Sequence, residues 1–337
     1  MANTDLAGVL MVHGGRVAAA RRAFPLAPEP WLDLSTGINP DPYLRPKLNP
    51  SDWTKLPDPQ ALAGLEAAMA VAFGVDNPAR VVAVPGSEAG LRLLPLLRGF
   101  ARVGIAGPTY GSHANAWGEA VEAPWADLMA DLNRFDVVVA VRPDNPTGAA
   151  IDADAMFAAV DALSARRGWF VIDEAFADAM PGFSLAADPR AACALILRSF
   201  GKFYGLAGMR LGAVIAPLAV AARLRHALGD WPISGPAIQI GTAAYTDACW
   251  TKTARARLWA SAARLDALLA RHGWTAIGGC PLFRLIDNAQ MPVLYNGLAR
   301  AGILTRAFAY RPDWLRIGLP GAEHEWCRLD TALGSFA

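Results

Sequence analysis

The chain has 337 residues, which is long for a single hydrophobic core, so two domains are expected. Hydrophobic residues make up 54% of the sequence and charged residues 18%, which leaves ample material for buried strands. The 31 basic and 30 acidic residues give a net charge of +1, and no basic block indicates a partner made of nucleic acid or anionic lipid.

The first 45 residues are expected to form a wrapping arm. Prolines recur between residues 25 and 46, and proline removes a backbone donor that a sheet would need. The sequence therefore predicts an N-terminal arm over residues 1–45 rather than part of a sheet.

Short apolar runs then alternate with longer helical patterns. Strands are predicted at residues 81–84, 103–106, 136–141, 169–172, 194–198 and 211–216. Helices are predicted at residues 60–73, 87–98, 112–119, 152–166 and 217–228. Most of these strands are too uniformly apolar to have one wet face, which predicts an α/β fold with a sheet covered by helices on both sides.

The pattern changes after residues 231–236, WPISGP. A long helical stretch, 237–272, is followed by weaker strand signals near 282–287 and 314–317, which predicts a smaller α+β domain. The expected boundaries are therefore an arm over residues 1–45, a large domain over 46–235 and a small domain over 236–337.

The sequence gives little indication of a metal site, a disulfide scaffold or a membrane helix. The four cysteines Cys193, Cys249, Cys280 and Cys327 are far apart, and the five histidines show no ligand spacing, so no metal site or disulfide scaffold is expected. No apolar run reaches the roughly 18 residues of a membrane helix. These features predict a cytoplasmic protein.

The most informative stretch is residues 196–212, ILRSFGKFYGLAGMRLG. It places Lys202 just past a buried strand, where an ammonium ion is poorly solvated and the nucleophilic amine is favoured. Ser199 and Arg210 offer a hydroxyl and a guanidinium that can hold a phosphate. An amine that forms a Schiff base beside a phosphate socket is what pyridoxal phosphate (PLP) requires. A strand end with solvated cations is the alternative for this stretch alone.

Two upstream segments favour the PLP interpretation. Residues 136–148, DVVVAVRPDNPTG, are a buried strand followed by Asn145, whose amide can donate to the phenolic oxygen of the ring. Residues 169–178, WFVIDEAFAD, place Asp173 at a strand end, where a carboxylate can keep the pyridine nitrogen protonated. Each motif alone also fits an ordinary turn or a helix cap. The ordered set, each member at a strand end, predicts a PLP site.

A further anion site is expected at the start of a helix. Gly86, Ser87 and Glu88 follow the predicted strand at 81–84, so their backbone N–H groups can face a phosphate with the helix dipole behind them.

The order NPTG, DEAF and SFGKFYGLAGMRLG resembles the fold type I PLP-dependent enzymes, in the aminotransferase branch near histidinol-phosphate aminotransferase. The resemblance covers nearly the whole chain. It implies a large domain with a mostly parallel seven-stranded sheet between helices, and a small α+β domain. It also implies that the N-terminal arm packs with the small domain and that the protein is a homodimer.

The resemblance assigns roles to individual residues. Lys202 would carry the cofactor, Asp173 would pair with its ring nitrogen, and Tyr110 would stack on the ring unless it is a core tyrosine. The implied cofactor-binding residues are Gly86, Ser87, Glu88, Tyr110, Asn145, Asp173, Phe176, Ser199, Lys202 and Arg210. Two positions depart from the family pattern. Phe176 replaces a tyrosine that donates to the ring, and Leu56 replaces a tyrosine that relatives contribute across subunits.

Arg316, in WLRIGLP, matches the arginine that holds the substrate α-carboxylate, because its planar fork takes two oxygens at once. A structural salt bridge is the alternative. The implied substrate-binding residues are His13, Gly14, Gly37, Ile38, Asn39 and Arg316. Among these, His13 would meet a substrate phosphate, unless it is simply solvated.

Four shorter segments resemble more narrowly the decarboxylases that act on L-threonine O-3-phosphate in cobalamin biosynthesis. They are HGG at 13–15, LDLSTGINP at 32–40, LPDP at 56–59 and DEAFAD at 173–178. The implied product is (R)-1-amino-2-propanol O-2-phosphate. Decarboxylation requires the Cα–carboxylate bond to stand perpendicular to the ring, and the sequence does not measure that angle. The alternatives are an aminotransferase of the histidinol-phosphate type and a non-catalytic ligand sensor.

Overall fold

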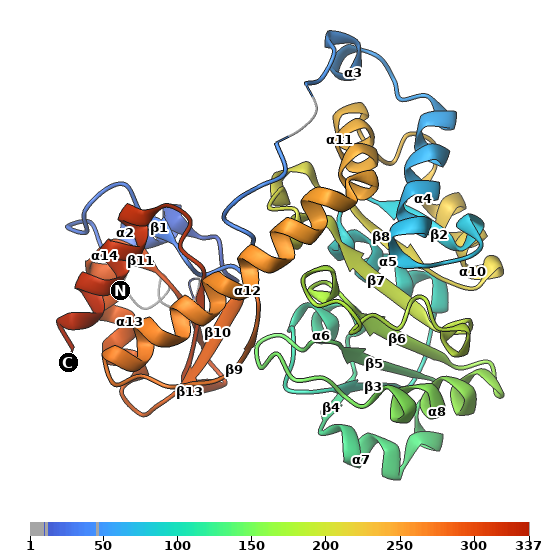
Figure 1. Ribbon diagram of the computed structural model, residues 1–337. Helices are drawn as coiled ribbons and strands as arrows, with labels where there is room; N and C mark the ends of the chain where they lie inside the picture. The colour runs from blue at the N-terminus through green and yellow to red at the C-terminus, as the bar shows by residue number, and fades with distance from the viewer. Residues whose placement is uncertain (1–9, 11–12, 45–46, 337) are drawn as a thin grey trace. The chain divides into compact units, whose positions relative to one another are not determined.

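The computed structural model describes residue 10, residues 13–44 and residues 47–336. Over these residues the chain forms two compact units, and Figure 1 labels most of their helices and strands. The large unit is residues 42–253. The small unit joins the described part of residues 1–41 to residues 254–336. Boundaries were expected near residues 45 and 235, and the second division falls later because α11 (Gly235–Thr246) packs on α4 (Pro59–Phe73) within the large unit.

A seven-stranded sheet forms the centre of the large unit among the residues described. In spatial order its strands are β2 (Val81–Val84), β8 (Gly212–Ile215), β7 (Leu195–Ser199), β6 (Trp169–Asp173), β5 (Val137–Val141), β3 (Val103–Ala106) and β4 (Val121–Ala123). Strand β8 is antiparallel to both of its neighbours, and the remaining pairs are parallel. The expected α/β fold with a mostly parallel seven-stranded sheet is therefore confirmed.

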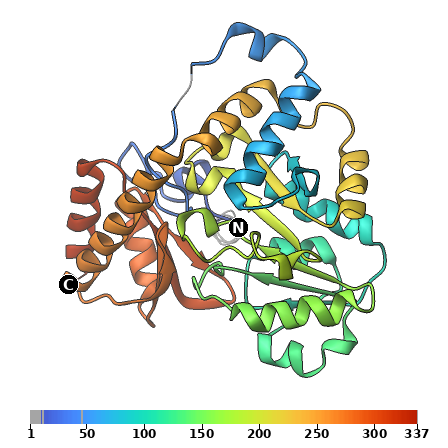
Figure 2. The same ribbon diagram turned by 45° about the vertical axis from the view of Figure 1, so that its right-hand side comes forward.

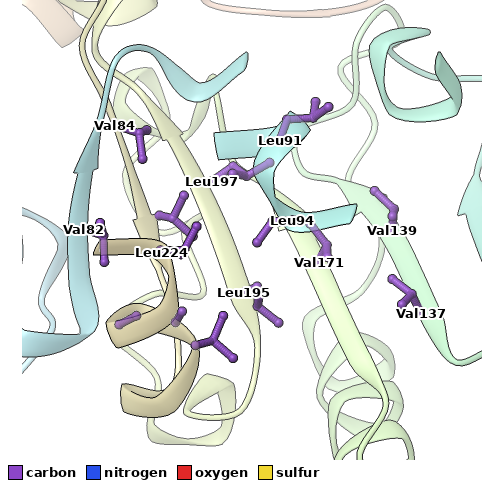
Figure 3. Close-up of a cluster of buried hydrophobic side chains, with 14 of the residues drawn as sticks. Val82, Val84, Leu91, Leu94, Val137, Val139, Val171, Leu195, Leu197 and Leu224 are labelled. Carbon is purple, nitrogen blue, oxygen red and sulfur yellow. The ribbon is translucent and has the colours of Figure 1, made fainter. Parts of the chain in front are cut away.

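One face of this sheet is covered by α5 (Ser87–Arg98) and α10 (Leu218–Leu228). Figure 3 shows leucines of both helices meeting alternate valines and leucines of the strands. Each such buried side chain contributes about 1.5–3 kcal/mol relative to exposure. Because side chains alternate along a strand, Val171 and Asp173 point to this same face.

The other face is covered by α4 and by α8 (Ala153–Ser164), whose inner residues Met69 and Met156 are fully buried. Helix α8 packs against β6, and it lies along the sheet in both views (Figure 1, Figure 2). With helices on both faces, the strands need no wet side, which explains their uniformly apolar sequences.

The remaining elements of the large unit are shorter. They are α3 (Pro50–Thr54), α6 (Ser112–Trp117), α7 (Trp125–Ala130), α9 (Phe200–Phe203) and the 3-10 turns η1 (Pro78–Arg80), η2 (Leu132–Arg134), η3 (Ala177–Ala179), η4 (Pro189–Ala191) and η5 (Ala207–Met209). The single helix expected over 237–272 is in fact two, α11 and α12 (Ala248–Arg271). The break occurs at Asp247, whose carboxylate accepts a hydrogen bond from the backbone of Trp250 and so starts a new helix.

The small unit holds a four-stranded antiparallel sheet. In spatial order its strands are β12 (Arg306–Phe308), β13 (Arg311–Gly318), β10 (Phe283–Asp287) and β9 (Ala276–Cys280). Its other elements are α2 (Val17–Ala23), β1 (Leu32–Asp33), α13 (Met291–Arg300), β11 (Ile303–Leu304) and α14 (Glu323–Gly334). The N-terminal arm was expected not to form part of a sheet. The structure differs, because strand β1 of the arm pairs in parallel with β11. None of the helices described is long and apolar enough to cross a membrane.

A buried ion cluster lies on the α8 face of the large sheet. Arg198, in β7, donates to Glu174 at 2.9 Å and also to Asp178, and all three side chains are buried. Glu174 further accepts from the backbone of Leu185 at 2.6 Å and from Ser184 at 2.6 Å. Burial raises the pKa of Glu174, and the guanidinium beside it opposes that rise. The ion pairs of this cluster therefore connect the end of β7 to the residues that follow β6.

Replacing Arg198 with methionine should lower the free energy of unfolding by about 3–5 kcal/mol, because two carboxylates would remain buried without their cation. Arg190→Met is the matched control, since Arg190 pairs with Asp154 and Asp188 on the exposed surface. It should change stability far less. Urea unfolding followed by circular dichroism measures both, and equal losses for the two variants would contradict the prediction.

Candidate active site

The polar residues predicted from the sequence converge at one edge of the large sheet. The carboxyl ends of parallel strands meet at one edge, where ligands of open α/β sheets bind. Strand β8 runs the other way, so its first residue, Gly212, lies at that edge, paired with Val84 of β2 and Ser199 of β7. A cavity of about 230 Å³ opens there.

All ten residues predicted to bind the cofactor line this cavity: Gly86, Ser87, Glu88, Tyr110, Asn145, Asp173, Phe176, Ser199, Lys202 and Arg210. The rest of its lining is mostly small or apolar: Leu91, Val141, Ala175, Gly201, Ala207 and Leu211. Amine, carboxylate, amide, hydroxyl and guanidinium groups thus share one enclosed space, so the grouping predicted from strand ends occurs in the folded chain.

An anion pocket forms where α5 begins. Gly86 precedes the helix with a φ of 87°, and a Cβ there would lie 2.5 Å from a guanidinium nitrogen of Arg210. A Cβ on Gly212 would lie 2.5 Å from the backbone nitrogen of Ser87. These two glycines let Arg210 and the first N–H groups of α5 approach one another. A helix N-terminus beside a guanidinium favours a phosphate.

The backbone of Arg210 is itself unusual. Its φ of 50° and ψ of 54° are left-handed, a conformation that costs a non-glycine residue about 1–2 kcal/mol. The residue follows the turn η5 and is separated from β8 by Leu211, and its guanidinium also donates to the carbonyl of Ala207 at 3.3 Å. Local strain of this kind collects at binding sites, where the surrounding fold holds it in place.

Asp173 is held by two donors at the end of β6. The backbone N–H of Ala175 donates to its Oδ1 at 2.9 Å, and Nε2 of His113 lies 3.0 Å from its Oδ2. The His113 side chain is fully buried, and its Nδ1 has no partner among the residues described. An Nε2–H of His113 is within hydrogen-bond distance of the carboxylate, so the ring can orient Asp173. Sequence reasoning missed His113, although it stands one helical turn after Tyr110.

Tyr110 enters the cavity from the loop after β3. Its hydroxyl donates to Oε2 of Glu88 at 3.3 Å, and its ring meets that of His113 edge to face at 6.1 Å. Burial is the main reason that the pKa of Tyr110 is raised. Glu88 also pairs with Arg92 one turn along α5, at 2.7 Å. The Glu88 side chain thus contacts both Tyr110 and Arg92. Its backbone N–H belongs to the first turn of α5.

Lys202 lies in α9, directly after β7. Its Nζ is 5.6 Å from the ring centre of Phe176, which is buried. A Cβ on the preceding residue, Gly201, would lie 2.6 Å from the Cα of Ala207. That glycine therefore allows the lysine turn to pack on the turn that leads to Arg210. Phe176 thus places an aromatic ring without a hydroxyl beside Lys202.

The residues predicted to bind substrate lie in the small unit. Arg316 of β13 is buried, donates to the carbonyl of Ser35 at 2.9 Å and stacks on the ring of Phe283 at 4.8 Å. Gly14 packs so closely on Ser35 that it leaves no room for a Cβ, and the Ser35 hydroxyl accepts from the N–H of Gly15 at 2.7 Å. The structure thus brings the HGG segment, the STG segment and Arg316 together.

For the other residues predicted to bind substrate, the structure gives burial and local contacts. Gly37 and Asn39 are buried, and Asn39 caps its own turn by accepting from the N–H of Asp41 at 3.0 Å. Ile38 and His13 are half-buried. The cofactor set and this substrate set therefore belong to different compact units.

A second arginine of the small unit was not predicted. Arg306 of β12 stands directly opposite Arg316 in the antiparallel register. Directly opposed residues share one face of a sheet, and two like charges in that position oppose each other. Such a pair is stabilised when anions lie against it. The sequence held no signal for this pairing, since the two arginines are matched only by strand register.

Comparison with known proteins now identifies the family. The model of class I and II aminotransferases matches residues 29–333, so the chain belongs to this family. Its relatives include threonine-phosphate decarboxylases from Pseudomonas aeruginosa, 40% identical over 97% of this chain and 98% of the relative, and from a Sinorhizobium species, 40% identical over 92% and 93%. Among solved structures, the histidinol-phosphate aminotransferase of Sinorhizobium meliloti in complex with pyridoxal-5'-phosphate superposes with a TM-score of 0.81 at 22% identity, covering 95% of this chain and 93% of that one.

The cavity suits the chemistry of PLP. Its donors match a phosphate monoester at the start of α5, and Asp173, an acceptor held by two donors, suits a protonated ring nitrogen. No group of His, Cys, Asp and Glu within the described part of the chain could hold a metal ion.

Gly86→Ala should weaken PLP binding by at least about tenfold, because the added methyl displaces the Arg210 guanidinium, and one charge-assisted hydrogen bond is worth about 1.5–3 kcal/mol. The left-handed φ of Gly86 adds a strain of about 1–2 kcal/mol for alanine, which the control must share. Gly99→Ala is the matched control, because Gly99 also has a left-handed φ, of 74°, and a Cβ there meets nothing within 4 Å. Spectrophotometric titration of both apoproteins with PLP measures the effect. Unchanged affinity in Gly86→Ala would rule out this phosphate socket.

Proposed function

We propose that this chain is a PLP-dependent decarboxylase that converts L-threonine O-3-phosphate into (R)-1-amino-2-propanol O-2-phosphate and CO₂, for the nucleotide loop of cobalamin. The observation that carries the choice of reaction is 40% identity, over nearly the full length, to relatives named threonine-phosphate decarboxylases. The solved aminotransferase with the same fold is only 22% identical, a level that supports the fold alone.

In this proposal the large unit holds the cofactor. Lys202 supplies the amine that attaches to the PLP aldehyde, and Asp173 faces the ring nitrogen. Arg210, Ser199 and the first N–H groups of α5 hold the phosphate. Tyr110 covers one ring face and Asn145 donates to the phenolic oxygen. The lining of the cavity by all of these groups supports the assignment.

When bound, PLP supplies an electron sink for the pair of electrons released at the substrate Cα. In the overall reaction the Cα–carboxylate bond breaks, CO₂ leaves, and a proton takes its place on Cα. Asp173 would keep a proton on the ring nitrogen, and His113 and the Ala175 N–H hold its carboxylate in place for this role. Lys202, whose amine would be freed when substrate replaces it, is assigned the transfer of the proton to Cα.

The substrate carries two anions, a carboxylate and a phosphate, and the small unit offers two arginines on one sheet face. We assign the carboxylate to Arg316, whose fork binds two oxygens at once. We assign the phosphate to Arg306 and, on the family resemblance alone, to His13. The direct opposition of the two arginines in the register of β12 and β13 supports a doubly anionic substrate.

The assembly and location also belong to this proposal. The family resemblance implies a homodimer, and the free cysteines suit a cytoplasmic protein. Leu56 is exposed between α3 and α4, at the position where relatives have a tyrosine. Light scattering after gel filtration measures the oligomeric state.

Lys202 should be the single site of covalent attachment. Borohydride treatment of the PLP-loaded protein, followed by digestion and mass analysis, should show the reduced cofactor on the peptide that contains Lys202. Lys202→Ala should bind PLP without this adduct. An unmodified Lys202 peptide in the unaltered protein would overturn the assignment of the cofactor site.

Incubation with L-threonine O-3-phosphate should release CO₂ in proportion to the substrate consumed, with no need for an oxo acid. Carbon dioxide and glutamate are measured side by side, with histidinol phosphate and 2-oxoglutarate as the parallel substrate pair. Formation of glutamate without CO₂ would identify an aminotransferase instead. A visible absorbance band that no amino acid shifts would indicate the non-catalytic sensor.

Arg306→Gln should raise KM for L-threonine O-3-phosphate by at least about tenfold, because a lost charge-assisted hydrogen bond costs about 1.5–3 kcal/mol. Turnover of saturating L-threonine, which has no phosphate, should stay the same as in the unaltered protein. Arg300→Gln is the control, since Arg300 is exposed in the last turn of α13 and does not take part in the pairing of β12 with β13. An equal loss for both substrates would contradict the phosphate assignment.

A further inference from the structure

Two neighbouring loops carry the groups assigned to the PLP ring. Tyr110 lies in the loop after β3, and Asn145 lies in the loop after β5, a strand that pairs directly with β3. A side chain that touches both loops therefore controls both ring contacts. Asp144, the residue before Asn145, is that side chain.

Within its own loop, Asp144 closes the turn around Asn145. Its Oδ2 accepts from the hydroxyl of Thr147 at 2.6 Å and from the backbone N–H of Thr147 at 3.2 Å. Its carbonyl accepts from the N–H of Gly148 at 2.8 Å, and its own N–H donates to Ala149 at 2.7 Å. Backbone and side chain of one residue thus hold both ends of the turn.

Between the loops, Asp144 forms a second connection. The hydroxyl of Thr109, the residue before Tyr110, donates to its Oδ1. Thr109 is buried, so water competes poorly for this bond. Burial raises the pKa of the Asp144 carboxyl, and the donors from Thr109 and Thr147 oppose the rise. The ion pairs found among the described residues do not include Asp144, so its partners are neutral hydroxyl and N–H groups.

We propose that Asp144 is a positioning residue that couples Tyr110 to Asn145, so that ring stacking and the contact to the phenolic oxygen form together. The inference rests on the proposed PLP site and adds a residue to which no role had been given. If the loops are coupled, loss of either ring contact loosens the other. Two contacts joined in this way are not additive.

The alternative is that Asp144 only closes its own turn. The two Thr partners separate these possibilities. Thr109→Val removes the bond between the loops and leaves the turn intact. Thr147→Val removes the turn bond and leaves the connection to Thr109. Thr109→Ser keeps a hydroxyl and should behave like the unaltered protein.

The test is a double-mutant cycle on PLP affinity of the full-length apoprotein, titrated with PLP and followed by absorbance. The two variants combined are Tyr110→Ala and Asn145→Ala. Tyr110→Phe is not used, because phenylalanine would still stack on the cofactor ring. In the parent protein the double variant should lose less affinity than the product of the two single losses, by about threefold or more. In the Thr109→Val background the losses should multiply. Thr109→Ser should restore the coupling.

Several outcomes would overturn the inference. Losses that multiply in the parent protein would show that the loops are independent. A coupling that survives Thr109→Val but disappears in Thr147→Val would assign Asp144 to its own turn alone. Circular dichroism of the bound cofactor, normalised to occupancy, and the thermal midpoint distinguish loss of ring positioning from loss of folding. Thr109→Ala replaces Thr109→Val if the latter does not fold.

Failure of the proposed function looks different. An unaltered chain that binds no PLP overturns both proposals, and the borohydride experiment on Lys202 reports that result independently. A chain that binds PLP through Lys202 but shows no coupling in the cycle keeps the proposed function and loses only the role of Asp144.

Discussion

Strand β8 runs against both of its neighbours, and the position of Arg210 depends on that direction. A seventh parallel strand would begin at the far edge of the sheet and leave the arginine there. The pairing of Gly212 with both Ser199 and Val84 brings the start of β8 to the edge where the parallel strands end. The chain therefore leaves β7, forms the turn with Lys202, and returns at the same edge. Amine and guanidinium meet the start of α5 for this reason.

Successive side chains of a strand point to opposite faces of the sheet, so neighbouring residues serve the cavity and the buried ion cluster in turn. At the end of β6, Asp173 faces the cavity, whereas Glu174 enters the ion cluster on the other face. At the end of β7, Ser199 lines the cavity and Arg198 supplies the cation of that cluster. The same strand ends thus carry the cavity on one face of the sheet and the buried ion cluster on the other. The ion cluster connects β6 to β7 at the place where their cavity residues must keep a constant spacing.

Neutral partners fix the orientation of the charged groups. His113 and the Ala175 N–H hold the Asp173 carboxylate, and Thr109 and Thr147 hold that of Asp144. A carboxylate with two fixed donors keeps its position without a cation beside it. Positioning of this kind costs no rearrangement when a ligand enters, which is the general advantage of a site built on strand ends.

The sequence alone determined the class of fold, the order of the strand-end motifs and ten of the residues that line the cavity, because apolar runs, turn residues and local motifs are properties of neighbouring positions. It did not determine the break of the long helix at Asp247, the pairing of β1 with β11, or the contact of His113 with Asp173 across 60 positions. It also could not match Arg306 to Arg316, or Thr109 to Asp144. Those contacts depend on strand direction and register, which are set by pairing between segments far apart in the chain, so only the tertiary structure decided them.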